Sequence, residues 1–299
     1  MATLYSHQDT NVRRTWFLMI TFVFVVIGIA WFFSYVLDNP FILYIAVIFS
    51  LAMNVIGYWY SDKIVLSLTG AKPVTREEYW ELYNIVENLA ITAGLPMPKI
   101  YVIKDIAPNA FATGRDKNHA VVAVTSGLLQ MMNRTELEGV IAHELAHIGN
   151  RDILLQTIVV VLVGFVVLLS DLFIRMSLSS RGGNNRGGSA KLVIALLGIA
   201  LAILAPIFAK LIQLAISRRR EFLADATGAL LTRYPDGLAS ALEKIGNYKG
   251  GMAITNGATA HLFIANPFGQ IGQKKGFKKM FLTHPPIEDR IKALQEDRV

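Results

Sequence analysis

The sequence contains no cysteine among its 299 residues, and this absence removes several classes of site. Disulfide bonds, thiolate zinc sites, cysteine nucleophiles and prenyl or palmitoyl anchors all need a thiol. Any metal ion that this chain binds must therefore be held by histidine or carboxylate side chains.

Charged residues are also scarce, at 17% of the chain, whereas 53% of the residues are hydrophobic. Ordinary globular domains carry about 25% charged residues, so a membrane protein is the first expectation. The net charge of +7 indicates contact with the anionic surface of a lipid bilayer. No basic stripe interleaved with aromatic residues is found, and nucleic acid is therefore not expected as a partner.

Four long apolar runs predict an α-helical integral membrane protein with two transmembrane hairpins. The spans of the first hairpin lie at about 16–37 and 41–60, and those of the second at about 153–174 and 192–216. At about 1.5 Å per residue, each run is long enough to cross a hydrocarbon core of about 30 Å. We expect Asn54, within the second span, to form a hydrogen bond to a neighbouring helix.

Each hairpin returns the chain to the side that it left, so the segments 61–152 and 218–299 can form one folded domain beside the hairpins 1–60 and 153–217. Apolar periodicity and turn residues predict a mainly helical α+β domain with a small sheet. Its first part has strands at 99–104, around 108–114 and at 120–124, and helices at 75–93, 126–132 and 135–149. The last of these helices is expected to open with a capping box of Thr135 and Glu138.

Basic residues near the ends of the spans predict the orientation of the chain in the membrane. The larger group shares the side of the folded domain: Arg13, Arg14, Lys63, Lys72, Arg134, Arg151, Arg218, Arg219 and Arg220. The positive-inside rule places this side in the cytoplasm. A smaller group in the loop of the second hairpin opposes this: Arg175, Arg181, Arg186 and Lys191. A re-entrant or shallow second hairpin would explain that loop.

The segment His143-Glu144-Leu145-Ala146-His147 has the spacing of a metal site. Residues four apart lie on the same side of a helix, so the two imidazoles can bind one ion. Glu144 falls within the apolar arc of this helix, beside the ion, where a carboxylate can take a proton from a water molecule. The pattern also arises by chance in roughly one chain of this size in a hundred, so the interpretation requires a third ligand.

A candidate for the third ligand follows the fourth predicted span. Glu221 and Asp225 are four residues apart, so they share a helix face, and the second hairpin returns that face to the level of His147. Glu221 would complete a His-His-Glu zinc site, and Asp225 would accept a hydrogen bond from an imidazole and fix its tautomer. A solvated helix face with ordinary acids is the alternative.

These features together resemble the HtpX-type membrane zinc metalloproteases, which are gluzincins related to the CAAX prenyl endoproteases. The resemblance is carried by the four spans and by three segments, 143–152, 220–225 and Thr283-His284-Pro285-Pro286. It implies a zincin-like domain that holds one Zn²⁺ per chain. The implied ligands are His143, His147 and Glu221, with Glu144 as general base and Asp225 in support.

The same resemblance implies two further roles. Asn109, Ala110 and Phe111 would form an edge strand that holds the substrate, and His284 would stabilise the oxyanion. Pro108 and Gly114 also fit a plain loop, and the prolines after His284 also fit the start of a helix.

The expected function is a zinc-dependent endopeptidase of the bacterial inner membrane, with its active site on the cytoplasmic side. Its expected substrates are misfolded membrane proteins or unfolded segments near the bilayer, as in membrane quality control and stress response. Two alternatives remain: a chaperone-like binder with a structural zinc site, and a zinc hydrolase of a non-peptide substrate. Glu144 argues against the binder, because a structural site has no use for a base between its ligands.

Overall fold

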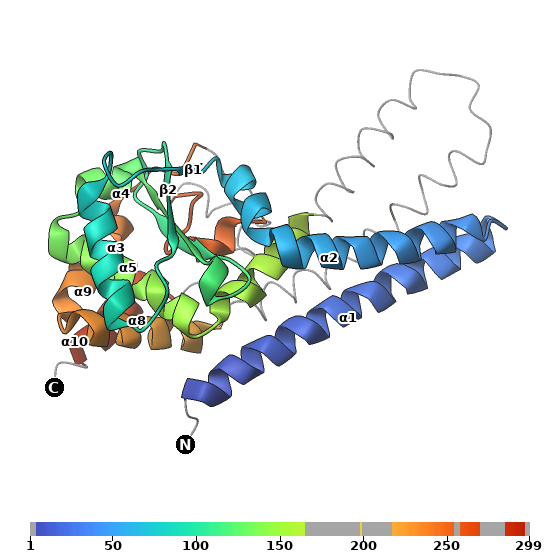
Figure 1. The fold of residues 1–299 in the computed structure, drawn as a ribbon, viewed down its shortest axis with the longest axis horizontal. Helices are drawn as coiled ribbons and strands as arrows, with labels where there is room; N and C mark the ends of the chain where they lie inside the picture. Colours follow the sequence, from blue (N-terminus) through green and yellow to red (C-terminus); the bar gives the residue numbers. More distant parts are fainter. Residues whose placement is uncertain (1–3, 165–197, 199–216, 254–257, 270–284, 297–299) are drawn as a thin grey trace.

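The computed structural model describes residues 4–164, 198, 217–253, 258–269 and 285–296. Its first two helices, α1 (Leu4–Val36) and α2 (Phe41–Thr69), form a hairpin that projects from a rounded domain (Figure 1). The hairpin exposes large apolar side chains, such as Phe24 at 71% and Ile48 at 70%. Both helices are long and apolar enough to cross a bilayer, which confirms the two predicted spans of the first hairpin.

The domain contains a four-stranded sheet with the order β1-β2-β4-β3. Its strands are β1 (Lys72–Pro73), β2 (Lys99–Ile103), β3 (Ala110–Thr113) and β4 (Val121–Thr125). Strand β2 pairs with β4 in parallel, and β3 pairs with β4 antiparallel. Strand β3 therefore forms one edge of the sheet, although it lies between β2 and β4 in the sequence.

Helices cover this sheet (Figure 1). They are α3 (Trp80–Thr92), α4 (Ser126–Met131), α5 (Arg134–Gly149), α8 (Arg218–Thr232), α9 (Pro235–Asn247) and α10 (Ile287–Glu296), with short 3₁₀ turns at Lys117–His119 and Ala260–Leu262. The fold class, a helical membrane protein with a mainly helical α+β domain, is confirmed.

Both faces of the sheet are buried, because alternate side chains of a strand point to opposite sides. One face packs against α3, α5 and α9 through Ile100, Val102, Val122 and Val124. The other face joins a core with the domain end of the hairpin, which contributes Leu18, Met19, Phe22, Val65 and Leu66. The membrane hairpin and the domain therefore share one hydrophobic core.

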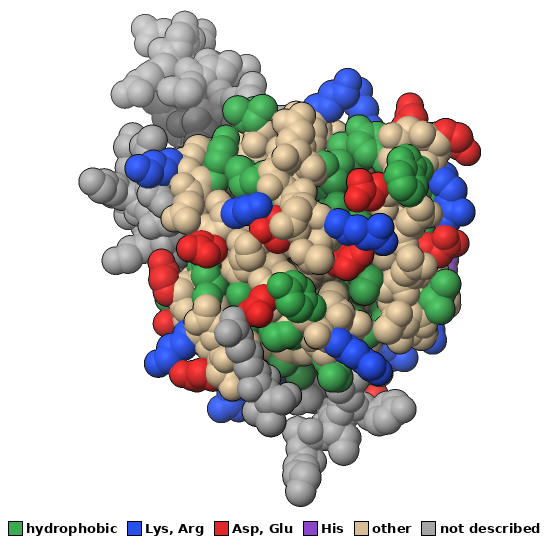
Figure 2. Space-filling view, turned by 90° about the vertical axis from the view of Figure 1, so that its left-hand side faces the viewer, with side chains coloured by type: hydrophobic (Ala, Val, Ile, Leu, Met, Phe, Trp, Pro, Cys, Tyr) green, Lys and Arg blue, Asp and Glu red, His purple; other side chains and the backbone are tan. Residues whose placement is uncertain are grey.

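The face of the domain that points away from the hairpin is different in character. Figure 2 shows acidic and basic side chains scattered over it, with apolar groups only in small patches. Mixed charge of this kind is typical of a surface in water. The molecule thus has a polar end and, in the hairpin, an apolar end.

The helix that follows α5 covers Asp152–Gly164 and makes an angle of 84° with it. The bend occurs at Asn150 and Arg151, where Arg151 has a positive φ of 58°. This helix begins at the start of the predicted span 153–174. The rest of that span, and the span 192–216 apart from residue 198, lie outside the described residues.

The predicted capping of α5 was wrong in its residues. The side chain of Asn133 accepts a hydrogen bond from the Glu136 N–H (3.0 Å), and the Glu136 carboxylate accepts one from the Asn133 N–H (2.9 Å). Asparagine is at least as good an N-cap as threonine, and the Thr135 hydroxyl instead donates to Asn133 Oδ1 (2.8 Å). Helix α2 continues beyond the predicted span 41–60 and ends at Thr69, where Gly70 caps it with a φ of 67°.

Candidate metal centre

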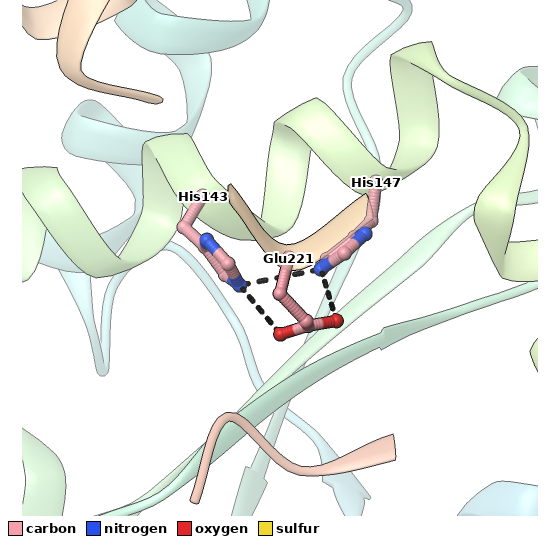
Figure 3. A group of neighbouring side chains, drawn as sticks. All are labelled: His143, His147 and Glu221. Atoms are coloured by element: carbon pink, nitrogen blue, oxygen red, sulfur yellow. Dashed lines mark hydrogen bonds and ion pairs between the residues drawn. The ribbon is translucent and has the colours of Figure 1, made fainter. Parts of the chain in front are cut away.

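Two imidazoles and one carboxylate converge at the centre of the domain (Figure 3). His143 and His147 point from one side of α5, and their Nε2 atoms are 3.2 Å apart. Glu221, in the first turn of α8, places its Oε1 3.7 Å from Nε2 of His147 and its Oε2 3.9 Å from Nε2 of His143. All three side chains are buried. The structure thus brings together the three residues that the sequence predicted as ligands.

The arrangement fits a zinc ion. Two nitrogen ligands at about 2.0–2.1 Å from a tetrahedral zinc are about 3.3 Å apart, close to the 3.2 Å between the two Nε2 atoms. The buried charge also fits, because four carboxylates face two guanidinium groups here: Glu144, Asp152, Glu221 and Asp225 against Arg220 and Arg290. When ionised, these groups leave an excess of two negative charges, which a divalent cation would neutralise.

Each imidazole has a carboxylate at its other nitrogen. Asp225, one turn after Glu221 on α8, places Oδ1 2.9 Å from Nδ1 of His143. Asp152, at the start of the next helix, places Oδ2 3.0 Å from Nδ1 of His147. Such contacts leave Nε2 of each ring directed at the centre and fix the ring orientation. The sequence singled out Asp225 for this place, whereas Asp152 was missed, although it stands only five residues after His147.

Burial and neighbouring charge set the protonation of the two imidazoles in the metal-free site. Burial lowers the pKa of His143 to about 4, against the hydrogen bond to Asp225, which acts in the opposite direction. Burial also disfavours a charged His147, but its hydrogen bond to Asp152 and the charge of Glu221 raise its pKa to about 9. A bound cation requires both rings to be neutral at Nε2, so metal binding at this site is coupled to loss of a proton.

Arg290 is a member of the site that the sequence did not suggest. It lies on α10, is fully buried, and donates to both oxygens of Asp225 at 2.8 and 2.6 Å. Its Nη1 also donates to the carbonyl of Ile264 (3.3 Å). Burial opposes ionisation of Asp225, but the charge of Arg290 and its hydrogen bonds lower the pKa of that carboxyl to about 2. Asp225 is therefore held ionised beside His143.

Helix α8 approaches α5 closely at Gly228. A Cβ atom at this position would lie 3.0 Å from the backbone nitrogen of His143 and 3.2 Å from its Cα, which is tighter than an ordinary contact. Gly228 lies two helical turns beyond Glu221. The missing side chain thus allows the two helices to come close enough for Glu221 to reach the imidazoles.

Glu144 lies on the sheet side of the site, with 2% of its surface exposed. The backbone N–H of Ala112 in strand β3 is near enough to this carboxylate to favour its ionised form. Burial is the largest influence on this group, and the net effect raises the pKa of Glu144 to about 7. Burial thus favours the protonated form of Glu144 in the metal-free site, and the charge of a bound divalent cation would act in the opposite direction.

The residues predicted to hold the substrate lie at the start of the same edge strand. Asn109 precedes β3, and its side chain donates to the Ala265 carbonyl (3.0 Å) and accepts from the Ala265 N–H (3.2 Å). The carbonyl of Ala110 accepts from the Ile264 N–H (3.0 Å). Phe111 is fully buried on the other face of the sheet. The chain itself therefore pairs with this part of the edge, and the substrate role of the three residues stays a prediction. His284 lies outside the described residues.

A buried His-x-x-x-His pair on one helix, with a glutamate from a second helix, defines the class of gluzincin metallopeptidases. Residues 77–298 match the model of Peptidase family M48, and the chain belongs to this family. The protein is thus a metallopeptidase, and its apolar helical hairpin makes it a membrane protein.

Curated relatives agree with this assignment. A protease HtpX homolog of Thermoanaerobacter pseudethanolicus is 49% identical over 302 residues, which cover 98% of this chain and 97% of the relative. A protease HtpX homolog of Pyrococcus furiosus is 47% identical over 285 residues, which cover 95% of this chain and 94% of the relative. The crystal structure of Ste24p from S. mikatae matches with a TM-score of 0.50 and 19% identity, covering 97% of this chain and 67% of that one. This last likeness concerns the fold.

Proposed function

We propose that the protein is a zinc-dependent endopeptidase that cleaves misfolded membrane proteins, or unfolded segments beside the bilayer, in the quality control of a bacterial inner membrane. One observation carries the proposal. Glu144 is a buried carboxylate between the two histidines of a buried His-His-Glu cluster. A structural zinc site gains nothing from such a group, whereas a hydrolytic site needs a base at this place.

Each side chain of the site would have a separate role in metal binding, ring orientation or proton transfer. His143, His147 and Glu221 would hold the ion, with Asp225 and Asp152 fixing the two rings. Zinc, when bound, supplies a positive charge that acidifies a water molecule and polarises the substrate carbonyl. Glu144 would accept the proton of the attacking water and pass it to the leaving nitrogen. His284 is proposed to stabilise the negative oxygen of the tetrahedral species.

Strand β3 supports an extended substrate. Ala112 of β3 lies near Glu144, so a peptide aligned along this edge would bring its carbonyl beside the base. Because Ile264 already pairs with Ala110, a peptide would pair with β3 beyond Ala110 or replace the Ile264 segment to reach Asn109, Ala110 and Phe111. Main-chain pairing requires an extended peptide and reads little of its side chains, which favours unfolded substrates of varied sequence.

The position of the site supports substrates that lie near the membrane. Helix α5, with both histidines, turns directly into the helix Asp152–Gly164, and α8, with Glu221, begins two residues after the predicted span 192–216. The metal site is therefore only a few helical turns from apolar segments. A folded protein could not bring an extended segment to this depth.

Replacement of Glu144 separates hydrolysis from metal binding. We expect Glu144→Gln to retain about one zinc per chain, because no ligand is lost, and to abolish cleavage of an unfolded membrane protein, because no base remains. His147→Ala should lose both zinc and cleavage. The assay is gel-based cleavage by purified protein with and without a chelator, with zinc measured by atomic emission. Cleavage by Glu144→Gln above the level with chelator would contradict the proposed mechanism.

A further inference from the structure

The first membrane helix reaches the metal centre through Asn11. This residue lies on α1, two residues after the start of the apolar span Asp9–Val36, and only 4% of its surface is exposed. It belongs to a buried stripe at helical spacing that continues with Thr15, Leu18 and Phe22. The later members of this stripe are apolar and join the shared core. Asn11 is therefore a polar group at the end of the stripe that points into the domain.

The amide of Asn11 is used by three partners. Its Nδ2 donates to Oδ1 of Asp152 (2.7 Å) and to the carbonyl of Asn150 (3.2 Å). Its Oδ1 accepts from Nη1 of Arg220 (3.2 Å). The donor faces a carboxylate and a carbonyl, and the acceptor faces a guanidinium, so the partners determine the orientation of the amide. Packing of α1 against the apolar core would not by itself require these hydrogen bonds of Asn11.

These partners adjoin the metal ligands. The other oxygen of Asp152, Oδ2, is the atom that contacts Nδ1 of His147 at 3.0 Å, so Asn11 holds the carboxylate that holds the ring. Arg220 directly precedes Glu221 on α8. Asn150 ends α5 at the bend after His147. Asn11 thus contacts the neighbours of two of the three ligands, from a residue that lies more than 130 positions away in the sequence.

We infer that Asn11 is a positioning residue of the metal centre, and that docking of the first membrane helix against the domain completes the zinc site. In this role Asn11 fixes the rotamer of Asp152, which directs Nε2 of His147 at the ion. Loss of an outer hydrogen-bond partner of a ligand commonly lowers metal affinity by about 10- to 100-fold. Asn11 is one hydrogen bond further from the ion than Asp152, so its loss is expected to lower zinc affinity by about 10-fold.

The inference rests on the proposed zinc site, and zinc affinity of the full-length protein in detergent tests both. Zinc dissociation constants, measured by competition with a chromogenic chelator, should rise by about 10-fold in Asn11→Ala. The matched control is Asn54→Ala, because Asn54 also donates a hydrogen bond within the hairpin, to the carbonyl of Met19 (3.3 Å), but lies away from the metal centre. This variant should bind zinc like the parent protein.

A double-mutant cycle shows whether Asn11 acts through Asp152. In the Asp152→Ala background, Asn11→Ala should change zinc affinity much less than in the parent, because the intermediate carboxylate is gone. The visible spectrum of the cobalt-substituted protein should shift in Asn11→Ala and not in Asn54→Ala, which a role in packing alone would not produce. Equal zinc affinity of Asn11→Ala and the parent would overturn the inference and leave the zinc site intact. Failure of the parent to bind zinc would overturn both.

Discussion

The side chain of Arg290, on the last described helix α10, contacts the metal centre through Asp225. Its guanidinium is completely buried, bonds both oxygens of Asp225 and lies 3.4 Å from Nε2 of His143. A buried ion pair costs desolvation for both partners, and removal of one partner leaves the other uncompensated. The pair therefore connects the position of α10 to the orientation of His143.

We expect Arg290→Met to lower the free energy of unfolding by about 3–5 kcal/mol, because the charge of Asp225 stays buried without its partner. Zinc affinity should fall as well, by roughly 10- to 100-fold, since Asp225 no longer holds His143 in place. Arg290→Lys should be intermediate, because lysine keeps the charge but not the two-pronged contact. Thermal unfolding of the detergent-solubilised protein and chelator competition measure the two effects.

The matched control for Arg290 is Lys292→Met on the same helix. Lys292 is exposed and forms a surface pair with Glu296, and loss of such a pair changes stability little. If Arg290→Met unfolded at the same temperature as Lys292→Met, the structural importance given to Arg290 would be wrong.

The spacing within a helix was sufficient to predict the residues that approach the metal centre from one element. His143 and His147 share a face because they are four apart, and Asp225 follows Glu221 for the same reason. Arg290 could not be found in this way. It contacts Asp225 across 65 residues, and no local pattern distinguishes it from the other basic residues of the chain. The same holds for Asn11, whose neighbours become apparent only in three dimensions.

At the scale of elements, the site depends on how closely α8 lies against α5. We expect Gly228→Val to destabilise the protein by about 1–3 kcal/mol, because the new side chain meets the backbone of His143 and forces the helices apart. Zinc affinity should fall with it, since Glu221 moves with α8. Thermal unfolding and chelator competition again provide the measurements.

The same substitution at Gly28 is the control for Gly228→Val. Gly28 is also helical, in α1, and a Cβ atom there would meet nothing within 4 Å. Gly28→Val should leave both unfolding and zinc affinity near those of the parent protein. A similar loss in the two variants would show that the close approach at Gly228 has no special importance.

Periodicity predicted the existence of the elements better than their arrangement. Strands β2, β3 and β4 and helices α4 and α5 lie within two residues of their expected bounds, because alternation and helical spacing are local signals. Helix α3 begins five residues later than expected, at Trp80, and strand β1 was not predicted. The strand order was not predicted. Strand β4 pairs directly with β2 in the sheet, although β3 lies between them in the sequence. Such pairing depends on contacts between distant parts of the chain. The capping residues of α5 were misjudged because two similar cap patterns, at Asn133 and Thr135, stand two residues apart.

At the scale of the molecule, the charged end shown in Figure 2 and the apolar hairpin predict how the protein sits in a membrane. The chain has no cysteine, so a single introduced thiol is a unique label. In the proposed cytoplasmic orientation of the domain, Lys117→Cys and Glu243→Cys, both at exposed positions, should react with an impermeant maleimide only after the membrane is opened. Asn39→Cys, at the far tip of the hairpin, should react in intact spheroplasts. The reverse pattern would place the metal centre outside the cytoplasm and exclude the proposed substrates.

The burial of Arg290 against Asp225 also has a consequence for the protein during its synthesis on the ribosome. His143 and His147 leave the ribosome long before Glu221, Asp225 and Arg290, and at roughly 5–20 residues per second the interval is on the order of ten seconds. Until Glu221 emerges the nascent chain lacks the third ligand, and until Arg290 emerges it lacks the group that holds Asp225 against His143. We therefore expect the metal site to stay incomplete during synthesis and to form only after α10 packs against α8.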